Sequence, residues 1–150
     1  MPHPQSNRFL PIREAIVAVL ANAPELSEVK AILRDRDAFA SIPETRYPAL
    51  GVFFADLAGA ERPRWASNRR DHAYHIEVHV AVRSLESAQA SEDLLFAYVE
   101  AVEDSLRGAP TLGGLVRFMA VTLVRRTRIQ VESYWQSQAA LLVTCEQRTP

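Results

Sequence analysis

Three histidines and a glutamate come nearest, by type and spacing, to a chemical site in this chain. His72, His75, Glu77 and His79 fall in one short segment, and imidazole and carboxylate groups are ordinary zinc ligands. His75 and His79 share one face of the strand expected there, but they lie roughly 13 Å apart along it. Ligand bonds of about 2.1 Å cannot bridge that separation unless the strand bends. The spacing favours a solvated or interface face of a sheet, with a small metal- or ligand-binding domain using His75, Glu77 and His79 as the lesser alternative.

The sequence has no arrangement typical of nucleophilic or phosphate chemistry. Cys145 alternates with apolar residues, which predicts a small buried side chain. No serine stands in a Gly-x-Ser-x-Gly turn. Gly113 and Gly114 lack the spacing and the lysine of a phosphate loop. We therefore expect no enzyme, no cofactor and no bound metal.

Arginines are the more suggestive candidates, and they gather in two places. They are Arg62, Arg64, Arg69 and Arg70 around Trp65, and then Arg125, Arg126 and Arg128. Arginine and tryptophan are enriched at the energetic centres of protein interfaces, whereas single-stranded nucleic acid is normally bound by a series of aromatic residues. We therefore prefer a protein interface as the interpretation of these arginine clusters. The alternative is that the arginines are ordinary solvent-exposed side chains. His75, Glu77 and His79 belong to the same set of interface candidates.

Two long elements must position these residues. From Asp71 to Glu86 apolar and polar residues alternate, which predicts a long strand with one apolar face. From Ala88 to Arg107 apolar residues recur every three or four positions, which predicts an amphipathic helix. Its apolar stripe is Leu95, Tyr98, Val99, Val102 and Leu106. Its acidic residues fall mainly on the opposite, solvent-facing side.

The remaining segments complete the order of elements. We expect a helix at 11–23 and a short strand at 29–34, although a helix fits the second segment nearly as well. A loop at 35–48, a buried strand at 49–57 and a polar connecting segment at 58–71 should follow. An extended segment at 117–131 and a last strand at 138–146 should complete the chain. Tyr134 to Gln136 should form the entry to that last strand. Gly108 should cap the long helix in a left-handed conformation.

This order predicts an α+β fold in a single domain spanning residues 1–150, with 1–9 as an extended or flexible arm. Consecutive strands joined by short turns favour a mainly antiparallel sheet of about four to five strands, with two main helices packed on one face. If the helix at 88–107 joins parallel strands, a right-handed crossover is expected.

Composition narrows the class of protein. The formal net charge of -1 gives no overall attraction to nucleic acid or membranes. A single cysteine excludes an internal disulfide framework and is typical of a reducing compartment. The first residues lack the basic and apolar pattern of a signal peptide, and no apolar run approaches the roughly 18 residues of a membrane span. We expect a protein made and kept in a cytoplasm.

The order of the expected elements and the sequences of several segments resemble those of the tail terminator (tail completion) proteins of tailed bacteriophages and prophages, including the Mu-like group. The matching segments are IREAIVAVL, YPALGVFF, the arginine-containing loop, HIEVHVAVRSL, LLFAYVEAVEDSLRG and YWQSQAALLVT, across about residues 10–147. None of them is a catalytic signature.

The resemblance implies a small structural subunit of the virion, assembled in the bacterial host cytoplasm. Copies would form a ring, typically a hexamer, on the head-proximal end of the tail tube. Its partners would be the tail tube protein, a head-completion or neck protein, and a sheath if the tail contracts. Genome DNA would pass only transiently through the bore, and no membrane is involved. A neighbouring neck role, as a head-completion or stopper protein, stays the alternative within this resemblance.

Overall fold

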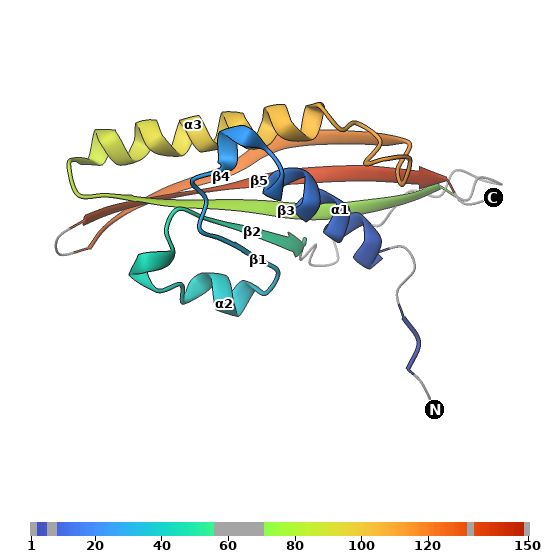
Figure 1. The fold of residues 1–150 in the computed structure, drawn as a ribbon, viewed down its shortest axis with the longest axis horizontal. Coiled ribbons are helices and arrows are strands. Elements are labelled where there is room, and N and C mark those ends of the chain that lie inside the picture. The colour runs from blue at the N-terminus through green and yellow to red at the C-terminus, as the bar shows by residue number, and fades with distance from the viewer. Residues whose placement is uncertain (1–2, 6–8, 56–70, 132–133, 149–150) are drawn as a thin grey trace.

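A five-stranded mixed sheet forms the centre of the protein, in the order β1-β2-β3-β5-β4 (Figure 1). The computed structural model describes residues 3–5, 9–55, 71–131 and 134–148. The strands are β1 (Ala31–Leu33), β2 (Ala49–Phe54), β3 (Asp71–Ser84), β4 (Phe118–Val131) and β5 (Tyr134–Arg148). β1 and β2 are parallel, and every other neighbouring pair is antiparallel. The predicted α+β fold with a mainly antiparallel sheet is confirmed.

Two helices, α1 (Phe9–Ala21) and α3 (Ala88–Arg107), cover one face of this sheet, as predicted (Figure 1). The hydroxyl of Ser87 accepts a hydrogen bond from the Ala90 amide at 3.0 Å, so it caps the start of α3. Since β5 is antiparallel to both β3 and β4, these two strands run parallel to each other. α3 therefore connects two parallel strands that are separated by β5. Of the described helices, none is long and apolar enough to span a membrane.

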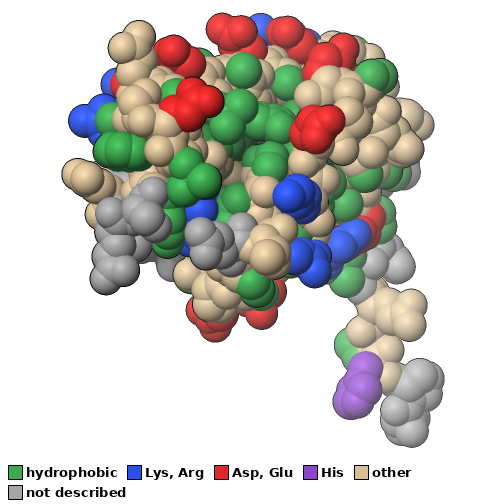
Figure 2. All heavy atoms as spheres, turned by 60° about the vertical axis from the view of Figure 1, so that its left-hand side comes forward, with side chains coloured by type: hydrophobic (Ala, Val, Ile, Leu, Met, Phe, Trp, Pro, Cys, Tyr) green, Lys and Arg blue, Asp and Glu red, His purple; other side chains and the backbone are tan. Residues whose placement is uncertain are grey.

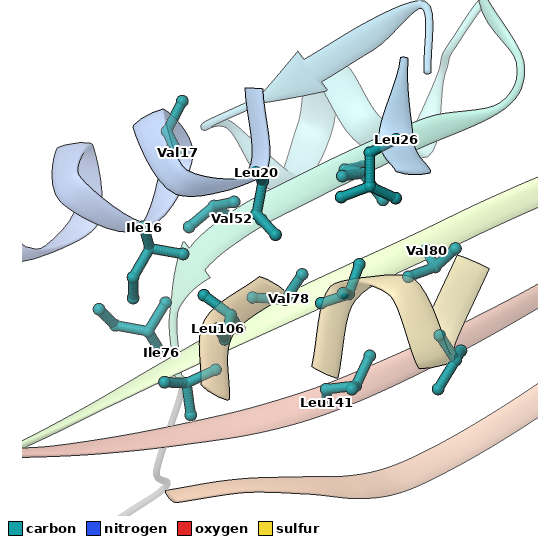
Figure 3. Close-up of a cluster of buried hydrophobic side chains, with 14 of the residues drawn as sticks. Ile16, Val17, Leu20, Leu26, Val52, Ile76, Val78, Val80, Leu106 and Leu141 are labelled. Atoms are coloured by element: carbon teal, nitrogen blue, oxygen red, sulfur yellow. The ribbon is translucent and has the colours of Figure 1, made fainter. Parts of the chain in front are cut away.

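The main core lies between these helices and the apolar face of the sheet (Figure 3). Its most deeply buried members come from α1, β2, β3, α3 and β5 together: Ile12, Ile16, Leu20, Leu50, Val52, Ile76, Val78, Val80, Val82, Leu95, Leu106 and Leu141. The predicted apolar stripe of α3 and the alternating apolar face of β3 are both confirmed. Cys145 is fully buried in the same cluster, and burial raises the pKa of its thiol to about 12. It is a packing residue, as predicted.

A second, smaller core lies on the opposite face of the sheet, and the sequence analysis missed it. The segment 35–48, predicted as a loop, contains α2 (Arg36–Ala40) and two flanking turns, with η2 (Glu44–Arg46) in the second. Asp35 caps α2 through a hydrogen bond from the Asp37 amide at 3.0 Å. Phe39 and Ile42 then pack on Phe53 and Ala49 of β2 and on Ala81 of β3. α2 covers only this end of the face, beside β1 and β2.

Two further predictions are wrong in their details. β5 spans Tyr134–Arg148 because it pairs with β3 from Trp135 to Arg148 and Tyr134 pairs with Val131 of β4, so Tyr134 to Gln136 lie within the strand. Gly108 has φ -71 and ψ -10, a right-handed conformation, and its amide is bonded back to carbonyls of the last turn of α3. The left-handed conformations occur later, at Gly113 (φ 70) and Gly114 (φ 92), where the chain turns into β4.

Candidate interaction surfaces of the sheet

The predicted interface residues fall into three groups. Arg62, Arg64, Trp65, Arg69 and Arg70 lie outside the described residues, as does the side chain of His72. His75, Glu77 and His79 lie on β3, and Arg125, Arg126 and Arg128 lie on β4. The structure therefore places the second and third groups only.

His75, Glu77 and His79 share the sheet face opposite α1 and α3, as predicted, but this face is not uniformly solvated. The rings of Phe39 and Phe53 pack beside the imidazole of His79, at centroid distances of 5.6 and 5.1 Å. His79 is consequently only 9% exposed. The prediction that it faces outward is wrong, because α2 covers it.

Glu77 and His79 form one electrostatic unit with Arg36. The Arg36 guanidinium donates a hydrogen bond to Glu77 and another to the backbone oxygen of Phe54 at 3.0 Å. Burial tends to raise the pKa of Glu77, but Arg36 and, less strongly, His79 bring it below its usual value. Burial lowers the pKa of His79, and the nearby Glu77 opposes this shift. Nε2 of His79 lies 3.4 Å from Oε1 of Glu77 without hydrogen-bond geometry. The unit fastens α2 to the sheet.

A metal site is not assembled here. In the described part of the chain, no group of three or more His, Cys, Asp or Glu side chains could hold a metal ion. His75 instead lies beside Thr144 of the neighbouring strand, with Nδ1 3.4 Å from the hydroxyl oxygen.

The three arginines of β4 do not form one patch. Arg126 pairs with Glu92 of α3 at 3.1 Å and lies over the ring of Phe96, and Arg128 approaches the same carboxylate at 3.8 Å. A register shift between Leu123 and Arg125 breaks the regular alternation. Arg125 lies opposite Ala140, on the sheet face that carries His79. Two arginines thus lie on the helix face and one on the other.

β4 is the most exposed long element of the sheet. It is an edge strand of 14 residues, and among the described strands only β5 pairs with it. Every described side chain from Thr122 to Arg128 is exposed. Three large apolar side chains are among the exposed ones on β4: Phe118 (54%), Leu123 (40%) and Val124 (54%). The sequence of β4 has apolar residues at both its odd and its even positions, such as Leu123 and Val124. Nothing in the sequence placed this strand at an edge.

The outer side of α3 is acidic. Asp93, Glu100 and Asp104 are exposed there, as predicted from the helical spacing. Figure 2 shows acidic side chains gathered along the top of the molecule, above a patch of hydrophobic side chains. The described surface therefore combines an acidic helix with an edge strand that carries three arginines and no acidic residue.

No protein-family model and no curated protein matches this chain. The function proposed below therefore rests on the geometry and on the resemblance of the sequence.

Proposed function

We propose that this protein is a structural subunit that assembles with copies of itself into a closed ring of the phage tail terminator type. The observation that carries the proposal is the outer edge of β4. It leaves a 14-residue row of backbone groups and three large apolar side chains without a described partner strand. Monomeric proteins normally shorten, cover, charge or twist away such edges, because they invite pairing with another chain. β4 carries arginines and one register shift, but its length and its exposed apolar side chains still leave an edge that another chain can pair with.

A second copy of this chain is the partner that the charges favour. β4 contributes three arginines, while α3 contributes Glu92, Asp93, Glu100, Glu103 and Asp104 against the single Arg107. Arg126 and Arg128 already lie against Glu92 within one copy. Arg125 of β4 and the exposed Asp93 and Glu100 of α3 are the charges that a contact between unlike surfaces of two copies can neutralise. A contact between unlike surfaces is heterologous, and repeating it closes a ring when the rotation between copies is suitable.

In this role the ring caps the head-proximal end of the tail tube, ends its polymerisation and offers a docking surface to the neck. The subunit works in the virion, and the host cytoplasm is where it assembles. Each subunit binds copies of itself in a ring of typically six. The ring binds the tail tube protein, a neck protein and, in a contractile tail, a sheath. Genome DNA passes through the bore only during ejection.

Electron microscopy of tail tubes polymerised with and without this protein tests the role. We expect a ring at one end of each tube and an arrest of tube growth. Rings that form but never bind a tube end would contradict the terminator role while leaving self-assembly intact. Binding to isolated heads in place of tubes would support the neighbouring neck role instead.

A further inference from the structure

We propose that the β1 edge of one copy receives β4 of the next copy, so that the sheet continues from subunit to subunit. This inference rests on the proposed ring and names its contact. β1 and β4 are the two ends of the five-stranded sheet, and no described strand lies beyond either of them. Pairing one with the other joins unlike edges, which is the heterologous contact that a ring requires.

β1 lies beside a hollow on the α2 side of the sheet. Ala31 and Leu33 of β1 form one wall of this hollow, and Ala38 and Ile42 contribute to the other. Its volume is about 300 Å³. A strand added to β1 would direct alternate side chains towards this hollow, since successive side chains point to opposite faces.

A second hollow lies on the other face of the same strand. Ile32 of β1, Val29 before it, Leu20 of α1 and Leu26 of η1 (Pro24–Leu26) line a volume of about 230 Å³. β1 is thus flanked by a hollow on each face, and each is lined by apolar side chains together with one basic residue, Arg46 on the α2 side and Lys30 on the α1 side. Main-chain bonds along an open edge together with pockets for alternate side chains are the features by which proteins bind an added strand.

β4 has the features of a strand that would fill this slot. Leu123, 40% exposed, lies opposite Leu141 and therefore on the helix face, while Thr122 lies opposite Leu142 on the other face. If the helix faces of the two copies lie on the same side of the joined sheet, Leu123 reaches the hollow near α1 and Thr122 reaches the hollow near α2. The pairing would cover on both faces the part of β4 around Thr122 and Leu123 that lies against the three residues of β1.

Charge at the β1 edge is mixed. Segment 24–46 has five acidic and four basic residues. Arg34 binds Glu14 of α1 at 2.7 Å, and Arg36 binds Glu77 of β3. Lys30 and Arg46 line the two hollows, and Glu28 and Asp37 stay exposed near β1. The pairing therefore rests on the open edges, the hollows and the side chains of Leu123 and Thr122, and not on charge.

Disulfide trapping between two variants tests the pairing. Facing residues on neighbouring strands have Cα atoms about 4.5–5.5 Å apart, within disulfide range. Copies with Lys30→Cys or Arg34→Cys, at the two ends of β1, are mixed with copies carrying Thr122→Cys or Val124→Cys. The native Cys145 is buried. We expect covalent dimers that join the two kinds of variant, and none from either variant alone.

The outcomes separate the two proposals. Rings that form while the mixed variants give no cross-link would overturn the β1–β4 pairing and leave the ring standing. Self-linking of Val124→Cys would also overturn it, because that result indicates two β4 edges meeting each other. A chain that stays monomeric under every condition would overturn both.

A bulky side chain in the hollow provides a second test with a matched control. Ala38 and Ala40 are both exposed on α2, but only Ala38 lines the hollow. We expect Ala38→Trp to raise the concentration for half-assembly by about tenfold or more, with Ala40→Trp close to wild type and equal melting temperatures for both. Equal assembly of the two variants would overturn the proposed slot.

Discussion

The hydroxyl groups of Ser91 and Ser137 meet at 2.7 Å between α3 and β5, where the residues are 0% and 1% exposed. This contact is a buried polar pair beside the hollow that Glu92, Arg126 and Arg128 line. Ser91→Ala should cost about 1–3 kcal/mol of unfolding free energy, because it leaves the Ser137 hydroxyl buried without a partner. The double variant Ser91→Ala/Ser137→Ala should cost less than the sum of the two single variants. Chemical denaturation of all four proteins measures this, and strict additivity would contradict the pairing.

Stability should depend on pH through His79. Burial lowers the pKa of its imidazole below the usual 6.5, so the unfolded chain binds a proton in a range where the folded chain does not. The free energy of unfolding should therefore fall as the pH drops from about 7.5 to about 5.5. Glu77 opposes the shift, while Arg36 and Arg125 reinforce it. The pKa of Glu77 is lowered from 4.5, so its own contribution is lost only at more acidic pH.

Denaturation of His79→Gln at both pH values checks this prediction, with His75→Gln on the same face as control. The pH-dependent loss should shrink in the first variant and persist in the second. An unchanged pH dependence in His79→Gln would show that the buried imidazole is not its source.

Arg36 should hold α2 against the sheet. Arg36→Ala removes the contacts to Glu77 and to the Phe54 carbonyl. We expect it to lower the free energy of unfolding by about 1 kcal/mol, since the Arg36 side chain is 41% exposed. Hydrogen exchange of the α2 amides should accelerate, while exchange in β3 and α3 stays slow. Arg34→Ala breaks the more exposed pair with Glu14 and serves as the control. Equal exchange in α2 for both variants would argue against the anchor.

The β4 surface should matter for assembly and little for folding. Val124→Glu places a charge on a side chain that is 54% exposed, so the melting temperature should change little. The protein concentration at which half of the chains are assembled should rise by about tenfold or more, because a carboxylate would be buried in the contact. Leu85→Glu, at a residue 73% exposed before α3, should assemble normally. Sedimentation velocity over a concentration series distinguishes them, and equal behaviour would remove β4 from the contact.

Much of the fold was predictable because two of its long elements, β3 and α3, have a regular pattern of apolar residues. The alternation of β3 and the stripe of α3 each identify a buried face without any tertiary knowledge. The helix at 88–107 has the predicted bounds, and the two helices cover one face as expected.

The second face was not predictable in the same way. Phe39 and Ile42 look like isolated apolar residues in a loop until α2 brings them onto Phe53. The burial of His79 follows from that contact, so the strand pattern alone could not reveal it. Alternation alone separates Arg125 from Arg126 and Arg128. Which face each of them takes depends on the register shift between Leu123 and Arg125, and no sequence signal marks that shift.

Native mass spectrometry of the isolated protein, over a range of concentrations, tests self-assembly most directly. We predict one discrete closed species, typically a hexamer of the 16.8 kDa chain, with negative-stain images showing a ring. A strictly monomeric chain at every concentration, and also in the presence of tail tubes, would contradict the central claim.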